Sequence, residues 1–398
     1  MGKYDFDKVI DRHGSGALKV DALSEFFGRQ DLKGLWVADM DFAVSPRIQE
    51  VLVERMRHPI YGYGAVSPTY WQSITDWLWH RHGWQVSREE LTYIPGVVKG
   101  IAYAVNFFSR PGDKIVIQPP VYHPFKMVIE GNGRVVANNP LICRGDSYEM
   151  DIDGLEHIFA EEHPTMMILC NPHNPIGIQW DEDTLRRVGE LACRYGVTVV
   201  SDEIHGDLVL YGKPHYPFAS VSEEAARVAV TLGAPSKTFN IAGLVSSWVV
   251  VKNKKLREPF YAWLAANEFD SPTFIATIAT EAAYRYGEDW LDECLAYIEG
   301  SIDETAAIIS DTMPGLRMIR PAASFLAWLD CRGLGLDHDS LQDLFINKAH
   351  LALNDGAMFG TEGTGFMRLN LGSPRCIIRE ALSSLALSLA PVHADRRP

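Results

Sequence analysis

The pattern that most constrains the fold is an alternation of short apolar strands with helices between residues 92 and 251. Strands are expected at residues 93–94, 114–118, 165–170, 197–201, 227–232 and 246–251. They are continuous apolar runs rather than alternations of apolar and polar residues. Strands of a mostly parallel sheet have this composition, because helices cover both faces of such a sheet. The chain is therefore predicted to form an α/β domain around a mostly parallel sheet.

The segments on either side of this core have different patterns. Residues 1–50 form an irregular lead-in around the dense cluster Leu35-Trp36-Val37-Ala38-Asp39-Met40-Asp41-Phe42. After residue 315 the pattern is of the α+β type, with strands expected at 324–329, 351–353 and 366–371 and helices at 339–350 and 375–389. We therefore expect an N-terminal segment (1–50), a large domain (51–287) and a smaller α+β domain (288–398).

The composition restricts the partners of the chain. Its formal net charge of −14 disfavours binding to nucleic acid or to an anionic membrane. No run reaches the roughly 18 apolar residues of a membrane-spanning helix, and the first ten residues lack the apolar run of a signal peptide. The six cysteines form no Cys-x-x-Cys pair, so no metal site is expected. These features predict a soluble cytoplasmic protein with reduced thiols.

Ligands in open α/β sheets lie at the carboxyl ends of the strands, so residues just after each expected strand are the candidates for a site. Gly96-Val97-Val98-Lys99-Gly100 follows the first strand. This stretch is either a helix N-terminus that suits a phosphate or a plain tight turn. Tyr122 follows residues 114–118, and its ring either covers a flat ligand or packs on the surface.

The next two strand ends carry Asn174 and Asp202. Asn174 lies in Asn-Pro-His-Asn-Pro-Ile-Gly, which is typical of a rigid turn, although a turn does not require both asparagines. Asp202 needs a partner, either an arginine or a protonated pyridine nitrogen, because an unpaired buried carboxylate is costly. His205 is interpreted as a hydrogen-bonded packing residue, with ligand binding as the alternative.

Lys237 follows the strand expected at 227–232 and lies between two small hydroxyl residues. Turn lysines are usually exposed, but a desolvated lysine loses its proton more readily, and the free amine attacks carbonyls. Arg368 lies in an apolar run, so its carboxylate partner is either an internal one or an amino-acid substrate. Together with Asn174 and Asp202, these residues form a complete set for pyridoxal 5'-phosphate (PLP), with Lys237 as the Schiff-base lysine.

The chain resembles the fold-type I PLP-dependent enzymes of the aminotransferase superfamily, and more narrowly the MalY/PatB group of cystathionine β-lyases (C–S lyases). The motifs that carry the resemblance are Trp36-Val37-Ala38-Asp39-Met40-Asp41-Phe42, Cys170-Asn171-Pro172-His173-Asn174-Pro175, Ser201-Asp202-Glu203-Ile204-His205, Ser236-Lys237-Thr238-Phe239-Asn240-Ile241-Ala242-Gly243-Leu244 and Gly365-Phe366-Met367-Arg368-Leu369-Asn370. They span nearly the whole chain. The resemblance implies a large α/β domain with a mostly parallel seven-stranded sheet, and an N-terminal segment that packs with the smaller α+β domain.

The resemblance also implies roles for the site residues. Lys237 would be the catalytic residue, which holds PLP as a Schiff base and then removes the substrate Cα proton. The cofactor would be bound by Val98, Lys99, Tyr122, Asn174, Asp202, His205 and Ser236 of one subunit and by Tyr63 of the other subunit of a homodimer. Val98, Lys99, Ser236 and Tyr63 would lie at the phosphate. The substrate would be bound by Ala38, Asp39, Tyr122 and Arg368.

Two positions depart from the family pattern. Many relatives have a small or apolar residue in place of Lys99. Relatives often have a hydroxyl residue in place of Ala234, so the alanine removes one contact to the phosphate.

The implied reaction is α,β-elimination of cystathionine or another S-substituted cysteine to a thiol, pyruvate and ammonia, within sulfur amino-acid metabolism. An aminotransferase would use the same lysine, aspartate and arginine and is the main alternative. A regulator without enzymatic activity would not need all three residues. A Rossmann dehydrogenase is disfavoured because no Gly-x-Gly-x-x-Gly follows an early strand.

Overall fold

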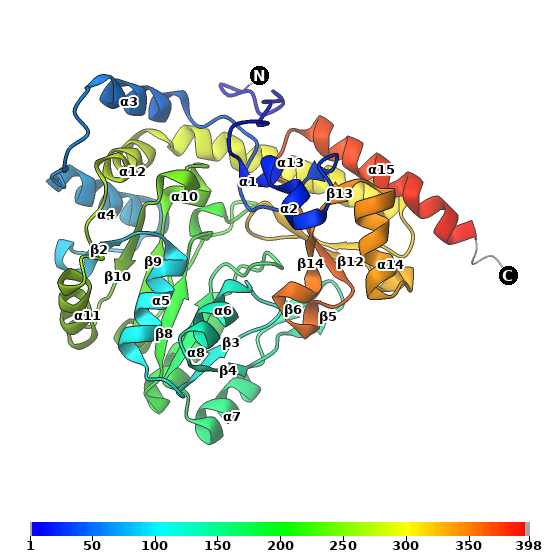
Figure 1. The fold of residues 1–398 in the computed structure, drawn as a ribbon. Coiled ribbons are helices and arrows are strands. Elements are labelled where there is room, and N and C mark those ends of the chain that lie inside the picture. The colour runs from blue at the N-terminus through cyan, green and yellow to red at the C-terminus, as the bar shows by residue number, and fades with distance from the viewer. Residues whose placement is uncertain (1, 395–398) are drawn as a thin grey trace.

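The computed structural model describes residues 2–394, and a seven-stranded sheet forms the centre of its large domain (Figure 1). In spatial order the strands are β2 (Leu91–Ile94), β10 (Ser247–Val250), β9 (Ala229–Gly233), β8 (Thr198–Asp202), β7 (Met166–Cys170), β3 (Lys114–Ile117) and β4 (Val135–Asn138). β10 is antiparallel to both neighbours, and the remaining pairs are parallel. The predicted fold class is confirmed.

Helices cover both faces of this sheet. One face packs against α5 (Val97–Phe108), α6 (Pro124–Gly131) and α11 (Lys254–Ala266), and the other packs against α7 (Ile152–Glu162), α8 (Glu182–Tyr195) and α9 (Glu223–Val228). Within β7, Met166 and Ile168 pack on the face that α5, α6 and α11 cover. Met167 and Leu169 pack on the opposite face, which α7, α8 and α9 cover. Burial on both faces explains why the strands are continuous apolar runs.

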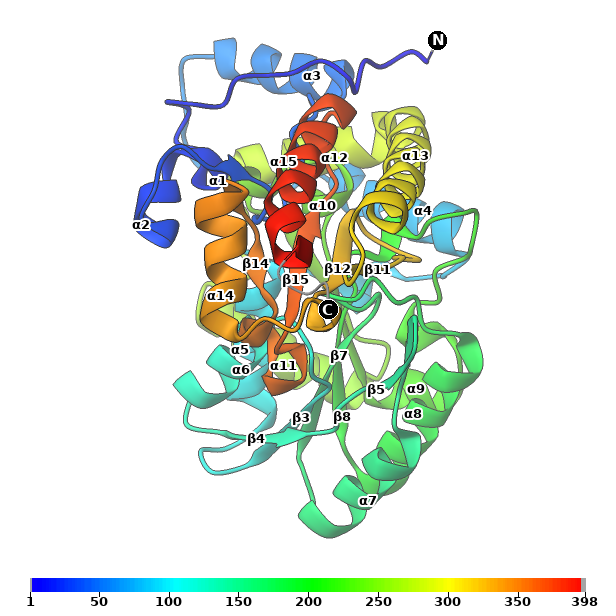
Figure 2. The ribbon, with the colours of Figure 1, turned by 90° about the vertical axis from the view of Figure 1, so that its right-hand side faces the viewer.

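The smaller domain contains a four-stranded antiparallel sheet in the order β11 (Arg317–Ile319), β12 (Leu326–Asp330), β15 (Phe366–Asn370) and β14 (Asn354–Asp355). The long helix α13 (Glu288–Thr312), α14 (His338–Asp343), a π-helix (Leu344–Lys348) and α15 (Arg375–Ala394) accompany it. The N-terminal strand β1 (Lys33–Gly34) pairs in parallel with β13 (Leu351–Ala352). Figure 2 accordingly shows α1 (Leu18–Asp21) and α2 (Leu23–Phe27) beside α14.

The remaining elements are α3 (Pro46–Arg57), α4 (Pro68–His82), α10 (Pro235–Thr238), α12 (Phe274–Tyr286), and the hairpin of β5 (Ile142–Arg144) and β6 (Ser147–Glu149). Short 3₁₀ turns lie at Arg88–Glu90, Gly206–Leu208, Phe218–Ser220, Ala242–Leu244, Arg332–Leu334, Gly356–Phe359 and Thr361–Gly363. The expected domain boundary at residue 50 falls inside α3.

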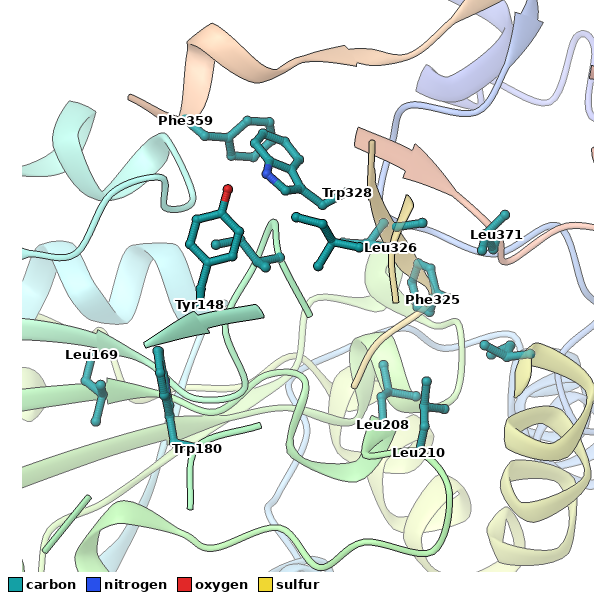
Figure 3. Packing of buried hydrophobic residues seen from close by; sticks show 14 of the residues in the cluster. Tyr148, Leu169, Trp180, Leu208, Leu210, Phe325, Leu326, Trp328, Phe359 and Leu371 are labelled. Atoms are coloured by element: carbon teal, nitrogen blue, oxygen red, sulfur yellow. The ribbon is translucent and has the colours of Figure 1, made fainter. Parts of the chain in front are cut away.

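The two domains meet through an apolar contact near the loop that follows β7 (Figure 3). Within the small domain, Trp328 of β12 packs edge-on against Phe359 at 5.6 Å between ring centroids. Tyr148 of the β5–β6 hairpin, in the large domain, lies beside this pair. Gly177 has φ +75°, and a Cβ there would lie 2.4 Å from the Cβ of Pro321. Only glycine fits this close approach, which brings the small domain against the Asn174 loop.

The structure corrects several expected elements. The strand predicted at 227–232 begins at Ala229, because residues 227–228 form the last turn of α9. The helix predicted at 339–350 changes to a π-helix after Asp343. Residues 351–352 pair with the N-terminal segment rather than within the small-domain sheet. Strand β4 was not predicted individually, because it is a partly exposed edge strand whose apolar run, Val135-Val136-Ala137, is only three residues long.

Candidate active site

A cavity of about 330 Å³ lies at the carboxyl ends of β7, β8 and β9, beside the N-terminus of α5. Nine of the predicted site residues line it: Ala38, Val98, Lys99, Tyr122, Asn174, Asp202, His205, Ser236 and Lys237. Asp39, Tyr63 and Arg368 lie outside its wall, although Arg368 contacts the wall through Asn174. The edge of the sheet that the strand-end argument selected is therefore where these side chains meet.

Lys237 is a partly buried residue rather than an exposed turn lysine. It lies in the short helix α10, directly after β9, and its Nζ donates a hydrogen bond of 2.5 Å to the carbonyl oxygen of Ala38. The next residue, Thr238, donates to a buried carboxylate oxygen of Asp207 at 2.8 Å, which anchors the helix. Burial lowers the pKa of Lys237 to about 8, against the opposing attraction of Asp39.

Asp202 is buried at the end of β8, and no lysine, arginine or histidine forms an ion pair with it within residues 2–394. One of its carboxylate oxygens accepts a hydrogen bond of 3.1 Å from the backbone N–H of Ile204. Burial raises the pKa of Asp202 to about 7. The arginine partner that the sequence left open is thus not present, and the carboxylate faces the cavity.

Arg368 is buried in β15 and has only neutral acceptors among the described residues, so the structure does not contain the internal ion pair that the sequence left open as the alternative to a substrate carboxylate. Its Nη1 donates to Asn174 Oδ1 at 3.0 Å, and its Nη2 donates to the carbonyl oxygen of Trp36 at 2.9 Å and to Asn354 Oδ1 at 2.5 Å. The guanidinium also lies 5.0 Å from the ring centroid of Phe359. Burial lowers the pKa of Arg368 to about 10. A buried cation without a counter-charge is suited to an anionic ligand.

His205 lines the cavity, but its Nδ1 is buried without a hydrogen-bond partner. The expectation of a fully hydrogen-bonded packing residue is therefore wrong for this nitrogen. Burial lowers the pKa of His205 to about 3, so the imidazole is neutral at physiological pH. Burial also raises the pKa of Tyr122, which keeps its hydroxyl protonated. Both rings present neutral surfaces to the cavity.

The N-terminal turn of α5 forms one end of the cavity. Gly96 precedes the helix with φ +112°, a conformation that favours glycine, and the N–H groups of the first helical turn lack partners within the helix. Lys99 is exposed, whereas Ser236 on the opposite side is buried. Ala234 is buried and provides no hydroxyl group. Backbone N–H groups and one serine hydroxyl make this end suitable for an anion.

Asp39, Tyr63 and Asn354 do not line the cavity. Asp39 forms an ion pair with Arg12, with 2.7 Å between Oδ2 and Nη2. Tyr63 is fully exposed on the loop after α3. Asn354, which contacts Arg368, was missed because only the pairing of β14 with β15 places it opposite that residue.

Neither a metal cluster nor a membrane-spanning helix is found in the part of the chain that the structure describes. No group of three or more His, Cys, Asp or Glu side chains there is placed to hold a metal ion. None of the helices between residues 2 and 394 is long and apolar enough to cross a membrane.

Comparisons with known proteins agree with this geometry. The sequence model of the family described as aminotransferase class I and II matches residues 34–385. The chain is 42% identical to the cystathionine β-lyase PatB of Bacillus subtilis, over 97% of this chain and all of that protein. It is 33% identical to the protein MalY of Escherichia coli, over 98% of this chain and all of that protein.

The fold of the chain is also similar to that of a solved structure. The PLP-bound C–S lyase of Staphylococcus hominis superposes with a TM-score of 0.91 at 30% identity, over 97% of this chain and 98% of that one. The family match covers most of the chain, and the PatB and MalY matches cover each relative completely. The resemblance inferred from the motifs is confirmed, and the chain belongs to the aminotransferase class I and II family.

Proposed function

We propose that this protein is a PLP-dependent carbon–sulfur β-lyase that cleaves cystathionine or related S-substituted cysteines. The observation that carries the proposal is the grouping around one cavity of Lys237, Asp202 and Arg368, none of which forms an ion pair among residues 2–394. A buried amine, carboxylate and guanidinium without counter-charges favour a ligand that supplies a partner group for each of them. The names of PatB and of the S. hominis enzyme support a sulfur-containing substrate.

The cavity fits this cofactor at the ring. Asp202 would pair with the protonated pyridine nitrogen, since it is a buried carboxylate without a cationic partner. The amide oxygen of Asn174 is already bonded to Arg368, so the amide nitrogen is the group that would donate to the ring oxygen. Tyr122 would cover the ring face, and the unpartnered Nδ1 of His205 would offer a further polar contact.

The cavity also fits the cofactor at its phosphate. The first turn of α5, including Val98 and Lys99, would bind phosphate oxygens through backbone N–H groups, and Ser236 would add its hydroxyl. The exposed ammonium of Lys99 would contribute little beyond long-range attraction, because water screens it. Ala234 would leave one contact of the family pattern unmade.

The chain's own residues would then bind the substrate and move its Cα proton. When bound, PLP supplies an electron sink for the charge left on Cα. Arg368 would hold the α-carboxylate through charge-assisted N–H···O bonds, for which its buried Nε has no other partner, with Ala38 and Asp39 beside the substrate. Lys237, in its free form, would remove the Cα proton, a role that suits an amine whose pKa is about 8. The sulfur would leave as a thiolate, and the resulting enamine would hydrolyse to pyruvate and ammonia.

A product assay tests the reaction type. The purified protein, loaded with PLP and given cystathionine without a keto acid, is expected to release thiol and pyruvate in equal amounts. Alanine, which has no leaving group on Cβ, is expected to give no pyruvate under the same conditions. An absolute requirement for 2-oxoglutarate, with no thiol released, would reject the lyase and favour the aminotransferase alternative.

Arg368→Lys is expected to raise KM for S-methylcysteine by about ten- to hundredfold, because lysine cannot form the bidentate pair with a carboxylate. The matched probe is the methyl ester of the same substrate, which lacks the carboxylate charge. Steady-state kinetics should show that the wild type strongly prefers the acid and that the variant has lost most of this preference. A variant that discriminates as well as the wild type would remove Arg368 from carboxylate binding.

The rate of PLP capture by the apoprotein is expected to rise with pH through a midpoint near 8. Only the unprotonated amine attacks a carbonyl, and burial lowers the pKa of Lys237 from 10.5 to about 8. Asp39 raises that pKa, so Asp39→Asn should move the midpoint to lower pH. Stopped-flow absorbance measures the rate, with Lys99→Ala as the control that leaves the midpoint unchanged. A midpoint that stays above 10 would contradict the assignment.

The active unit proposed here is a homodimer in which Tyr63 reaches the phosphate of the neighbouring subunit. Ile60, Tyr61 and Tyr63 are 67%, 56% and 110% exposed, and an open groove of about 900 Å³ runs along α3 nearby. That groove shares no lining residue with the active-site cavity. Exposed aromatic residues on one loop support burial against a second copy.

Subunit complementation tests this arrangement. Lys237→Ala and Tyr63→Ala homodimers are each expected to be impaired, but a mixed dimer should contain one complete site with Lys237 of one chain and Tyr63 of the other. Unfolding and refolding the two variants together should therefore restore activity above either variant alone. No gain in a dimer shown to be mixed would place Tyr63 within its own subunit or outside the site.

The remaining expectations are retained as proposals. The division into residues 1–50, 51–287 and 288–398 is supported by the β1–β13 pairing, which joins the N-terminal segment to the small domain. Six free thiols support a location in the reducing cytoplasm. The net charge of −14 supports small-molecule amino acids rather than nucleic acid or a membrane as partners.

A further inference from the structure

Residues 36–42, here called the carbonyl segment, cross the active site without forming a helix or strand. Their backbone oxygens, rather than their side chains, contact the two cationic site residues. The carbonyl of Trp36 accepts from Arg368 Nη2 at 2.9 Å, and the carbonyl of Ala38 accepts from Lys237 Nζ at 2.5 Å. One irregular stretch thus serves both the substrate-binding guanidinium and the catalytic amine.

Asn240 holds this segment from the large domain, three residues after Lys237. Its Oδ1 accepts from the N–H of Met40 at 3.0 Å, and its Nδ2 donates to the carbonyls of Met40 and Phe42 at 2.9 Å each. Asn240 has φ +56°, a left-handed conformation that asparagine tolerates better than most residues. The backbone conformation of Asn240 directs its side chain toward the carbonyl segment, and the side-chain amide forms the hydrogen bonds to it.

Asn370 holds the same segment from the small domain, two residues after Arg368. Its Nδ2 donates to the carbonyls of Val37 and Asp39 at 2.6 and 2.7 Å, and its Oδ1 accepts from the N–H of Gly372 at 2.7 Å. The side chain is completely buried. An asparagine can satisfy such backbone donors and acceptors together because its amide carries both kinds of group.

The acidic side chains of the segment are held by a charge cluster. Asp39 and Asp41 bond to Arg12, and Asp41 also lies 2.8 Å from the Nζ of Lys19, which is completely buried. Two carboxylates and two cations balance within the cluster. The side chains of the segment are therefore fixed while its carbonyls remain directed at the site residues.

We propose that Asn240 and Asn370 are positioning residues, which place the Ala38 carbonyl to orient the free amine of Lys237 and the Trp36 carbonyl to orient Arg368. A carbonyl oxygen only accepts, so it engages an N–H of the amine and leaves the lone pair free to point at the substrate. It also stabilises the ammonium that forms when the amine takes a proton. The inference rests on the proposed lyase function, in which Lys237 is the base at Cα.

The variant Asn240→Gly keeps the left-handed backbone and removes the three side-chain hydrogen bonds. Its kcat is expected to fall about tenfold with KM within twofold, the cost of misplacing a group held by buried hydrogen bonds. The isotope effect with Cα-deuterated substrate should increase, because proton removal becomes the slow step. Asn370→Ala is expected instead to raise KM about tenfold through Arg368. Asn106→Ala, on the exposed face of α5, is the control.

A second readout does not depend on turnover. The pH midpoint of PLP capture by the Asn240→Gly apoprotein should shift downward, because a lost acceptor favours the neutral amine. An unchanged isotope effect and an unchanged pH midpoint in a folded Asn240→Gly variant would overturn the positioning role. The proposed lyase function would still stand in that case if the wild type cleaves cystathionine. A shifted midpoint in a protein that cleaves no thioether would support the positioning role and reject the lyase.

Discussion

Lys237→Ala is expected to lower kcat for thioether cleavage by about four orders of magnitude, the upper end of what one general base contributes. The substitution removes the only group in the cavity that combines a primary amine, partial burial and a lowered pKa among the described residues. Alanine can neither attach the cofactor nor accept the Cα proton, so both proposed roles are lost together. Pyruvate formation measures the loss, and the visible absorbance of the cofactor in dialysed protein measures the attachment.

The matched control for this variant is Lys99→Ala. Lys99 also lines the cavity, but it is exposed at the helix end, and we expect its removal to change kcat by less than about threefold. Near-normal turnover by Lys237→Ala would refute the assignment of the base and with it the proposed mechanism. A large loss in Lys99→Ala would show that an ammonium group at the phosphate end has been undervalued.

The strand-end argument predicts that Asn174, Asp202 and Lys237 meet, and they line one cavity because their positions are local consequences of the sheet. Asp202 is the last residue of β8 and pairs with Cys170 at the end of β7, so parallel register alone brings the loops after both strands together. Lys237 lies in the one-turn helix α10, which follows β9, the next strand in the sheet. Apolar runs and chain order are sufficient for this part of the site.

The surroundings of Arg368 could not be predicted in the same way. Its partners Asn174 and Trp36 lie 194 and 332 residues away in the chain, and Asn354 depends on the register of β14. An apolar sequence context showed that the guanidinium is buried, but it could not distinguish neutral acceptors from a carboxylate. Contacts that depend on how two domains and an N-terminal segment meet leave no periodic pattern in the sequence.

His205 and β4 show two further limits. The Nδ1 of His205 has no hydrogen-bond partner because no polar group of the described chain lies within reach of it. The spacing of residues in the sequence does not predict that a partner is missing. β4 is recognised in the structure by its parallel pairing with β3, while its own residues are partly exposed and its apolar run is only three residues long. Edge strands carry weaker hydrophobic patterns because only part of their surface is buried.

Asp202→Asn is expected to lower kcat by about 10²–10⁴-fold, which corresponds to the roughly 3–5 kcal/mol lost when a buried charge pair is broken at one partner. Asparagine has nearly the same shape and can keep the hydrogen bond from the N–H of Ile204, so the fold of the loop is preserved. It cannot carry the negative charge that would keep the pyridine nitrogen protonated. KM should change little, because the proposed site for the substrate carboxylate is a different residue, Arg368, which does not contact Asp202.

Asp207→Asn separates this electrostatic role from a structural one. Asp207 is a buried aspartate that accepts hydrogen bonds from Trp77 and Thr238, yet it does not line the 330 Å³ cavity. Its replacement should lower Tm, since its hydrogen bonds hold α10 in place, while kcat stays within about tenfold of the wild type. If the two variants lost kcat equally at matched stability, the effect would come from packing behind the site. A selective loss in Asp202→Asn would instead show that the charge of that carboxylate acts on the ligand.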